Sequence, residues 1–197
     1  MACAGRPLLE WSVDVLSSVC ERVVVAIPAG YDVGDDTGFE TVTGGRSRSE
    51  SVRNALASAP EAEIAVVHDA ARPLLTRELV ERCVAAIHAP GVDGAIAAAP
   101  VADTIKEADG SGRVLQTLDR SSLWSVQTPQ VFWAPRLRAA LDVDDDTLAA
   151  ATDDAGLVEA DGGTVAIVDA PRENLKVTTP LDLRIAEALL ERRTADA

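Results

Sequence analysis

The chain has 197 residues, which is enough for one hydrophobic core, and it is most simply a single domain over residues 1–197. Hydrophobic residues make up 47% and charged residues 25%, which excludes wholesale disorder, and no apolar run is long enough to span a membrane. The net charge of −14 argues against nucleic acid as a partner, because a phosphate backbone requires a basic face. A small phosphorylated ligand is not excluded, since it needs only a local cluster of cations.

The cysteine content and the N-terminus bear on the cellular compartment. Cys3, Cys20 and Cys83 are odd in number and form no Cys-x-x-Cys pair, so we expect free thiols in a reducing compartment. No basic flank followed by an apolar stretch opens the chain. We therefore expect a cytoplasmic protein with no membrane partner. The histidines, His68 and His88, are too few and too far apart for a histidine-based zinc site.

Helical and strand patterns alternate along the first hundred residues. In chain order we expect a helix over 8–19, strands over 22–27 and 39–42, a helix over 48–58, a strand over 64–67, a helix that Thr76 caps and that runs to about 88, and a strand over 94–99. Strands that alternate with helices predict a parallel-rich, three-layer α/β sandwich. The chain opens almost directly on a helix, so the first strand and loop of such a sheet are expected to be absent.

The alternation of helical and strand patterns changes at about residue 100. The segments 103–107 and 114–118 alternate in polarity and flank a polar turn over 109–112, which is typical of a β-hairpin. A hairpin inserted into a series of strands and helices is expected to project from the core, so we predict an arm over about 100–124. After the segment 127–132 we expect helices over 135–141 and 154–160, a strand over 164–168 and a last helix over 180–193.

The segment 65–73 places functional side chains directly after a predicted strand. Ligand chemistry in α/β sheets gathers at such positions, because strand ends and helix N-termini converge there. Small residues after Asp69 leave space for another molecule, and Arg72 offers a planar fork of donors suited to a phosphate or a polyol. A buried strand that ends in a structural Asp69–Arg72 pair explains the same residues equally well.

A second cluster combines Gly44 and Gly45 with Ser51, one turn into the next predicted helix. Paired glycines allow a backbone to approach a base or a ribose. Taken alone, however, an ordinary glycine turn before a helix is the better interpretation.

Two further clusters lie in the second half of the chain. Arg120 and Thr128 offer donors to a phosphate from the segment 119–130. Lys176 precedes a helix start marked by Thr179 and Pro180, and it is one of only two lysines in a chain that otherwise uses arginine. Such a lysine can bridge the phosphates of two substrates, although a solvated surface cation is the usual fate of lysine.

The order and spacing of these clusters, together with the segments 100–106 and 152–155, resemble the 2-C-methyl-D-erythritol 4-phosphate cytidylyltransferases of the non-mevalonate isoprenoid pathway. The resemblance runs from Gly5-Arg6-Pro7-Leu8 to the last helix. It implies a Rossmann-like nucleotidyltransferase sandwich with a projecting arm. It also implies transfer of CMP from CTP to 2-C-methyl-D-erythritol 4-phosphate, giving 4-diphosphocytidyl-2-C-methyl-D-erythritol and pyrophosphate, with Mg²⁺ present.

The resemblance implies a role for each matching residue. Arg120 and Lys176 would hold the methylerythritol phosphate for attack, with Asp69 near both substrates. The other residues of that pocket would be Arg72, Thr104, Thr128 and Thr152, and those on the nucleotide side would be Gly44, Gly45, Ser51 and Ala70. The arm would embrace a second subunit, so that Thr104 and Arg120 act in the active site of the partner within a homodimer. The metal ligands stay open.

One feature departs from the family. Its first strand and glycine-rich loop, whose arginine and lysine grip the CTP phosphates, have no counterpart before Gly5. We therefore expect impaired activity from these 197 residues. Two alternatives stay open, a non-catalytic dimeric module that binds a sugar phosphate and a related cytidylyltransferase that acts on a pentitol phosphate. The enzyme is favoured, because Arg72, Arg120, Thr128 and Lys176 are all present.

Overall fold

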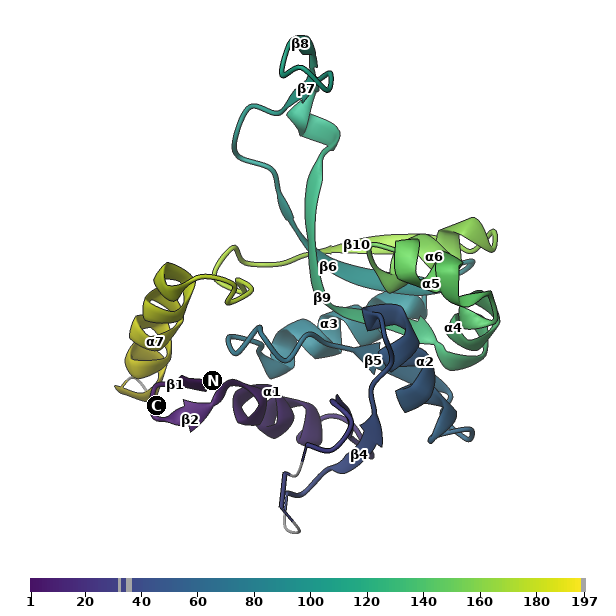
Figure 1. The fold of residues 1–197 in the computed structure, drawn as a ribbon, viewed down its shortest axis with the longest axis vertical. Helices are drawn as coiled ribbons and strands as arrows, with labels where there is room; N and C mark the ends of the chain where they lie inside the picture. Colours follow the sequence, from purple (N-terminus) through teal and green to yellow (C-terminus); the bar gives the residue numbers. More distant parts are fainter. Residues whose placement is uncertain (32, 35–36, 196–197) are drawn as a thin grey trace.

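A four-stranded mixed sheet forms the centre of the computed structural model, which describes residues 1–31, 33–34 and 37–195 (Figure 1). In spatial order its strands are β10 (Val165–Asp169), β6 (Gly94–Pro100), β9 (Trp124–Trp133) and β5 (Ile64–Val67). β10 runs parallel to β6, whereas β9 is antiparallel to both of its neighbours. Since β5, β6 and β10 run in the same direction, the expectation of a parallel-rich sheet fails only at β9. The physical reason is that the hairpin arm reverses the chain before β9 enters the sheet.

Helices cover both faces of this sheet and make the expected three layers. α3 (Arg77–Ile87) packs on one face against Ala95, Ala97 and Val131. On the other face, Ile96 and Phe132 belong to a core that includes residues of four helices. Those helices are α2 (Arg48–Ala57), α4 (Ala134–Leu141) and α6 (Asp154–Ala160), with α5 (Asp145–Ala150) adding Leu148. Neighbouring residues of β6 thus face opposite cores, as the two-residue period of a strand requires.

Side-chain caps explain where several of these helices begin. The Ser47 hydroxyl accepts a hydrogen bond from the Glu50 backbone N–H, and the Thr76 hydroxyl accepts one from Leu79. Asp144 caps α5 in the same way through Thr147, although this helix was not among those expected from the sequence. Short polar residues before the first turn therefore set these starts locally.

A second part of the molecule surrounds α1 (Leu8–Ser17). It contains a small hairpin of β1 (Ala2–Cys3) and β2 (Arg6–Pro7), which was not expected from the sequence, and the last helix α7 (Pro180–Ala195). Cys3, Leu74 and Leu190 share a buried cluster that joins the hairpin to α7. The start of the chain therefore packs against the last helix, where Glu187 Oε1 accepts a hydrogen bond from the Ala4 backbone N–H at 3.2 Å.

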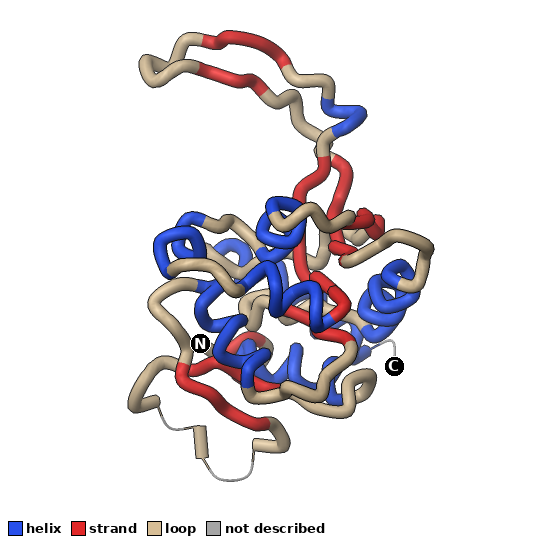
Figure 2. Tube along the Cα trace, turned by 90° about the vertical axis from the view of Figure 1, so that its right-hand side faces the viewer, coloured by secondary structure: helices blue, strands red, loops and turns tan. Residues whose placement is uncertain are grey.

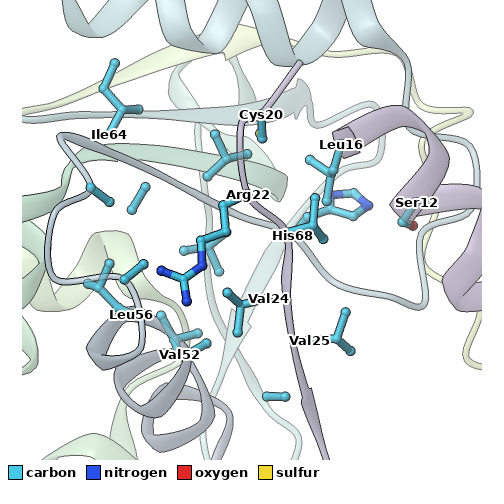
Figure 3. A pocket seen from close by; sticks show the side chains of 18 of the residues that line it. Ser12, Leu16, Cys20, Arg22, Val24, Val25, Val52, Leu56, Ile64 and His68 are labelled. Carbon is cyan, nitrogen blue, oxygen red and sulfur yellow. The ribbon is translucent and has the colours of Figure 1, made fainter. Parts of the chain in front are cut away.

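The strands β3 (Val24–Ile27) and β4 (Glu40–Thr43) form a separate parallel pair. Among the residues that the structure describes, β3 pairs with β4 alone and β5 with β9 alone. β3 and β5 instead line a shared cavity of about 860 Å³, into which side chains of α1, α2 and both strands project (Figure 3). Every residue of the two strands is only half-buried. Among the described residues, the β3–β4 pair is therefore separated from the four-stranded sheet by this cavity.

The predicted hairpin arm is confirmed. β7 (Lys106–Ala108) and β8 (Val114–Thr117) pair antiparallel and project well away from the body of the molecule (Figures 1 and 2). The Asp109 carboxylate accepts hydrogen bonds from the backbone N–H groups of Ser111 and Arg113, which stabilises the turn. Every residue of the two strands is exposed. Within the described residues, no helix is long and apolar enough to cross a membrane.

Candidate active site

Asp69 lies two residues after the end of β5 and faces three cations, one from the start of α2, one from its own turn and one from the loop before α7. Its Oδ1 atom accepts a hydrogen bond from Arg48 Nε at 3.1 Å, and its Oδ2 atom lies 2.9 Å from Lys176 Nζ. Arg72 Nε lies 3.8 Å from the same Oδ2. The structure therefore joins the predicted segment 65–73 and the predicted cluster around Lys176 at one carboxylate. Lys176 is not a free surface cation, although 44% of its side chain is exposed.

The electrostatic surroundings of Asp69 favour its ionised form. Burial raises the pKa of this carboxyl, but the hydrogen bond from Lys176 and the charge of Arg48 outweigh it, so the pKa lies below its ordinary value. The carboxylate is thus charged at neutral pH and holds two cations in fixed positions. An anionic ligand that reached these cations would meet donors that are already oriented.

Arg48 bridges Asp69 to a second, deeply buried carboxylate. Its Nη1 atom lies 2.7 Å from Asp154 Oδ2, and the Asp154 side chain is 0% exposed. Burial raises the pKa of Asp154, and the charge of Arg48 offsets this only in part. The Oδ1 atom of Asp154 has no hydrogen-bond partner among the described residues. Sequence reasoning did not assign Arg48 to the site, and its position at the start of α2, just after the glycine pair, was the only available signal.

Buried amides hold the loop that carries Lys176. Arg72 Nη1 donates to the backbone oxygen of Asn174 at 2.8 Å. The Asn174 side chain in turn donates to Gln127 Oε1 and to the backbone oxygen of Thr128, both at 2.8 Å. Burial lowers the pKa of Arg72. Because β9 and the loop before α7 are tied together in this way, Arg72 and Lys176 keep a fixed relation to Asp69.

Gly44, Gly45 and Ser51 lie together at the start of α2. Ser51 Oγ accepts from the Gly45 backbone N–H at 3.0 Å and donates to the Ser47 oxygen at 2.9 Å. A Cβ atom at Gly45 would lie only 2.2 Å from Cγ of Glu50, so local packing already requires glycine there. The glycine turn before a helix is therefore present as predicted, and the nucleotide role of these residues stays a prediction.

Three of the predicted site residues lie apart from the Asp69 cluster within one chain. Thr104 and Arg120 are exposed on the arm, where Arg120 Nη1 donates to the backbone oxygen of Ala102 at 2.5 Å. Thr152 is exposed just before the Asp153 cap of α6. Thr128 lies near the cluster, since its Oγ1 accepts from the Asp69 backbone N–H at 3.0 Å, and Ala70 is exposed beside it.

The cluster suits phosphate chemistry better than a metal centre made of protein ligands. Within residues 1–31, 33–34 and 37–195, no group of three or more His, Cys, Asp or Glu side chains is arranged to hold a metal ion. Both oxygens of Asp69 face cations. Mg²⁺ sites that use substrate phosphates need only one or two protein carboxylates. The donor set therefore fits a magnesium ion that is held mainly by phosphate oxygens.

Comparison with solved structures defines the class of protein. The crystal structure of 2-C-methyl-D-erythritol 4-phosphate cytidylyltransferase from Thermus thermophilus matches with a TM-score of 0.86 and 35% identity, over 96% of this chain and 92% of that one. The chain is an α/β nucleotidyltransferase. The family model described as IspD, 2-C-methyl-D-erythritol 4-phosphate cytidylyltransferase, matches residues 1–192. The chain belongs to this family.

Curated relatives agree with this assignment. The 2-C-methyl-D-erythritol 4-phosphate cytidylyltransferase of Nocardia farcinica is 43% identical over 199 residues, covering 97% of this chain and 84% of the relative. The enzyme of the same name from Rubrobacter xylanophilus is 46% identical over 168 residues, covering 82% of this chain and 72% of the relative. The predicted family and fold class are confirmed.

Proposed function

We propose that the chain transfers CMP from CTP to 2-C-methyl-D-erythritol 4-phosphate and releases pyrophosphate, as a step in isoprenoid biosynthesis. The observation that carries this proposal is the convergence of Arg48, Arg72 and Lys176 on Asp69 at the end of β5. Family membership disfavours both the non-catalytic sugar-phosphate module and the related pentitol-phosphate enzyme.

In the proposed reaction, a phosphate oxygen of the polyol attacks the α-phosphorus of CTP in line. The new P–O bond forms as the bond to the β-phosphate bridging oxygen breaks, and the electron pair leaves with pyrophosphate. Lys176 and Arg72 hold the attacking phosphate, and Asp69 keeps these cations in place. Such a site works mainly by positioning two anions and by stabilising the charge that develops between them.

The remaining assignments are those that the family resemblance implies. Gly44, Gly45, Ser51 and Ala70 take the nucleotide side, and Thr128 and Thr152 complete the polyol phosphate pocket. Mg²⁺ accompanies the triphosphate, screens its charge and is held mainly by phosphate oxygens. A cytoplasmic location fits the three free thiols.

We further propose a homodimer in which the arms are exchanged. The arm, whose segment 100–124 includes Thr104 and Arg120, projects away from the body of the molecule (Figure 2). Val114 and Leu115 on the arm are 55% and 59% exposed, which gives a second copy an apolar surface to cover. Each active site then combines Asp69, Lys176 and Arg72 of one protomer with the arm of its partner.

One experiment tests the transfer reaction and the exchanged arms together. Pyrophosphate release is measured for the wild-type protein with CTP and methylerythritol phosphate. Lys176→Ala and Arg120→Ala should each lower kcat/KM by about 100-fold or more, because a charge-stabilising donor is lost. Arg77→Ala is the matched control, since among the described residues this exposed cation forms an ion pair only with Glu81 on α3. Unfolding and refolding the two inactive variants together should restore about a quarter of the wild-type activity, because half of the dimers then hold one intact site.

Three outcomes would contradict these proposals. Binding of the polyol phosphate without any pyrophosphate release would support the non-catalytic module. Faster turnover of a pentitol phosphate would support the related enzyme. An inactive mixture of the two inactive variants would place Arg120 and Lys176 in the same protomer's site.

A further inference from the structure

Both ring nitrogens of His68 take part in hydrogen bonds to groups that flank the Asp69 turn. Nδ1 lies 3.0 Å from Thr128 Oγ1, and Nε2 lies 3.1 Å from the backbone oxygen of Arg72. A carbonyl oxygen can only accept, so Nε2 must carry a proton. The ring also lines the cavity beside β5, near Leu16 of α1 (Figure 3).

The directions of these hydrogen bonds follow from the charge of the ring. Burial lowers the pKa of His68 to about 4, so the ring carries a single proton at neutral pH. The charged groups that act on the ring are Asp69, Arg72 and Arg48. With the proton on Nε2, Nδ1 accepts and the Thr128 hydroxyl donates to it. The same Thr128 oxygen accepts from the Asp69 backbone N–H at 3.0 Å.

A continuous chain of hydrogen bonds therefore encloses the turn. It runs from the Asp69 N–H through the Thr128 hydroxyl to the His68 ring and ends at the Arg72 carbonyl. The turn is closed internally by the Arg72 N–H, which donates to the Asp69 oxygen at 2.9 Å. Since Thr128 has one hydroxyl proton and directs it to His68, this hydroxyl has no proton left to donate to a bound phosphate, so Thr128 can line the polyol phosphate pocket but does not serve there as a donor.

We propose that His68 is a positioning residue that sets the separation of Asp69 and Arg72 by clamping both ends of the turn that carries them. At the Asp69 end, His68 acts through the Thr128 hydroxyl, which accepts a hydrogen bond from the Asp69 backbone N–H. At the Arg72 end, the His68 ring donates directly to the Arg72 backbone oxygen. The inference rests on the proposed function, because Arg72 is assigned to the polyol phosphate and Asp69 to both substrates. Loss of the hydrogen bond at the Arg72 end and loss of the hydrogen bond at the Asp69 end should therefore change different kinetic parameters.

Two substitutions separate the two ends of the clamp. An asparagine amide lies near the position of Nδ1, so His68→Asn keeps a partner for Thr128 and loses the Arg72 bond. A glutamine amide reaches the position of Nε2, so His68→Gln keeps the Arg72 bond and loses the Thr128 bond. We expect His68→Asn to raise the KM for the polyol phosphate about tenfold with little change in kcat, which corresponds to the loss of one hydrogen bond. We expect His68→Gln to lower kcat about tenfold instead.

Matched variants control for general damage to the fold. Thr128→Val should behave like His68→Gln, and Thr128→Ser should restore most of the activity because it keeps the hydroxyl. His88→Asn changes the other histidine, which follows α3 and packs its ring against Trp133, and it should leave both parameters unchanged. Equal losses in kcat and in both KM values for His68→Asn and His68→Gln would overturn the proposal.

Nitrogen NMR of the wild-type histidines provides a test that needs no variant and no substrate. The proposal requires that His68 show a protonated Nε2 and an unprotonated Nδ1 at neutral pH. A proton on Nδ1 would overturn it even if the variants fail to fold. This measurement reports only which ring nitrogen of His68 carries the proton, so it tests the proposal whether or not the protein is active. If the wild-type protein releases no pyrophosphate, that result counts against the proposed function only.

Discussion

β6 and β3 are both short apolar strands, yet only β6 is buried. The first six residues of β6, mostly alanine and glycine, are buried, whereas the more hydrophobic sequence Val24–Ile27 of β3 is half-buried throughout. β6 has a paired strand on each edge and a helix layer on each face. β3 has one paired edge, and its other edge lines the cavity. Burial is thus decided by neighbours and not by the hydrophobicity of a strand.

The largest expected effect contrasts a core residue of the sheet with a residue of the cavity wall. Phe132 is fully buried and packs over Gly94, so Phe132→Ala should lower the free energy of unfolding by about 4 kcal/mol. Val25 lines the cavity, so Val25→Ala should cost less than about 1 kcal/mol, since few packed neighbours are lost. Urea unfolding of both variants measures the difference. Equal costs would show that β3 is packed as well as the four-stranded sheet.

A second expected effect depends on pH and tests the boundary of the cavity. The pKa of His68 falls to about 4 in the folded protein, from an ordinary value of 6.5. Below pH 6.5 His68 binds a proton in the unfolded chain but stays neutral in the folded chain. The free energy of unfolding therefore falls as the pH is lowered toward 4. The loss should approach about 3 kcal/mol at pH 4.

Urea unfolding at half-unit pH steps measures this loss. In His68→Asn, the loss of stability that the histidine causes between pH 6.5 and 5 should disappear, and most carboxylates do not yet titrate in that range. An unchanged slope in the variant would mean that water entering from the cavity hydrates the ring and leaves its pKa near the ordinary value.

The smallest expected effect compares two thiols. Cys83 is fully buried under the four-stranded sheet, and burial raises its pKa to about 11. Cys20 lines the cavity and is only half-buried, although burial also raises its pKa. A thiol-specific reagent should therefore modify Cys20 at least about tenfold faster than Cys83 in the native protein. Mass spectrometry of the labelled peptides distinguishes the sites, and equal rates would imply that the protein opens as a single unit.

Local signals predicted much of the fold. Helix starts at Ser47 and Thr76 depend on side chains within three residues of the helix they cap. The hairpin turn depends on Asp109 and its immediate neighbours. The helix α5 and the β1–β2 hairpin were not predicted, because each is too short to show a hydrophobic period.

The candidate site was predicted only in part. Asp69, Arg72 and Lys176 were predicted as site residues from their positions at element ends and from the family resemblance, and the structure brings them together. Arg48 was missed, because its importance comes from Asp154, a buried carboxylate 106 residues further along the chain. The role of His68 was missed for the same reason, since its partner Thr128 lies 60 residues away on β9.

Short-range patterns in the chain specified the helices and strands with clear periods, the arm and the family, because each of these is written in residues close to one another or in the order of motifs. The packing of distant segments set the antiparallel placement of β9, the cavity beside β3 and the cation cluster on Asp69. These depend on which segments exclude water from one another and on which charges share one buried position. No periodicity or spacing along the chain records such contacts, because they exist only after the chain has folded.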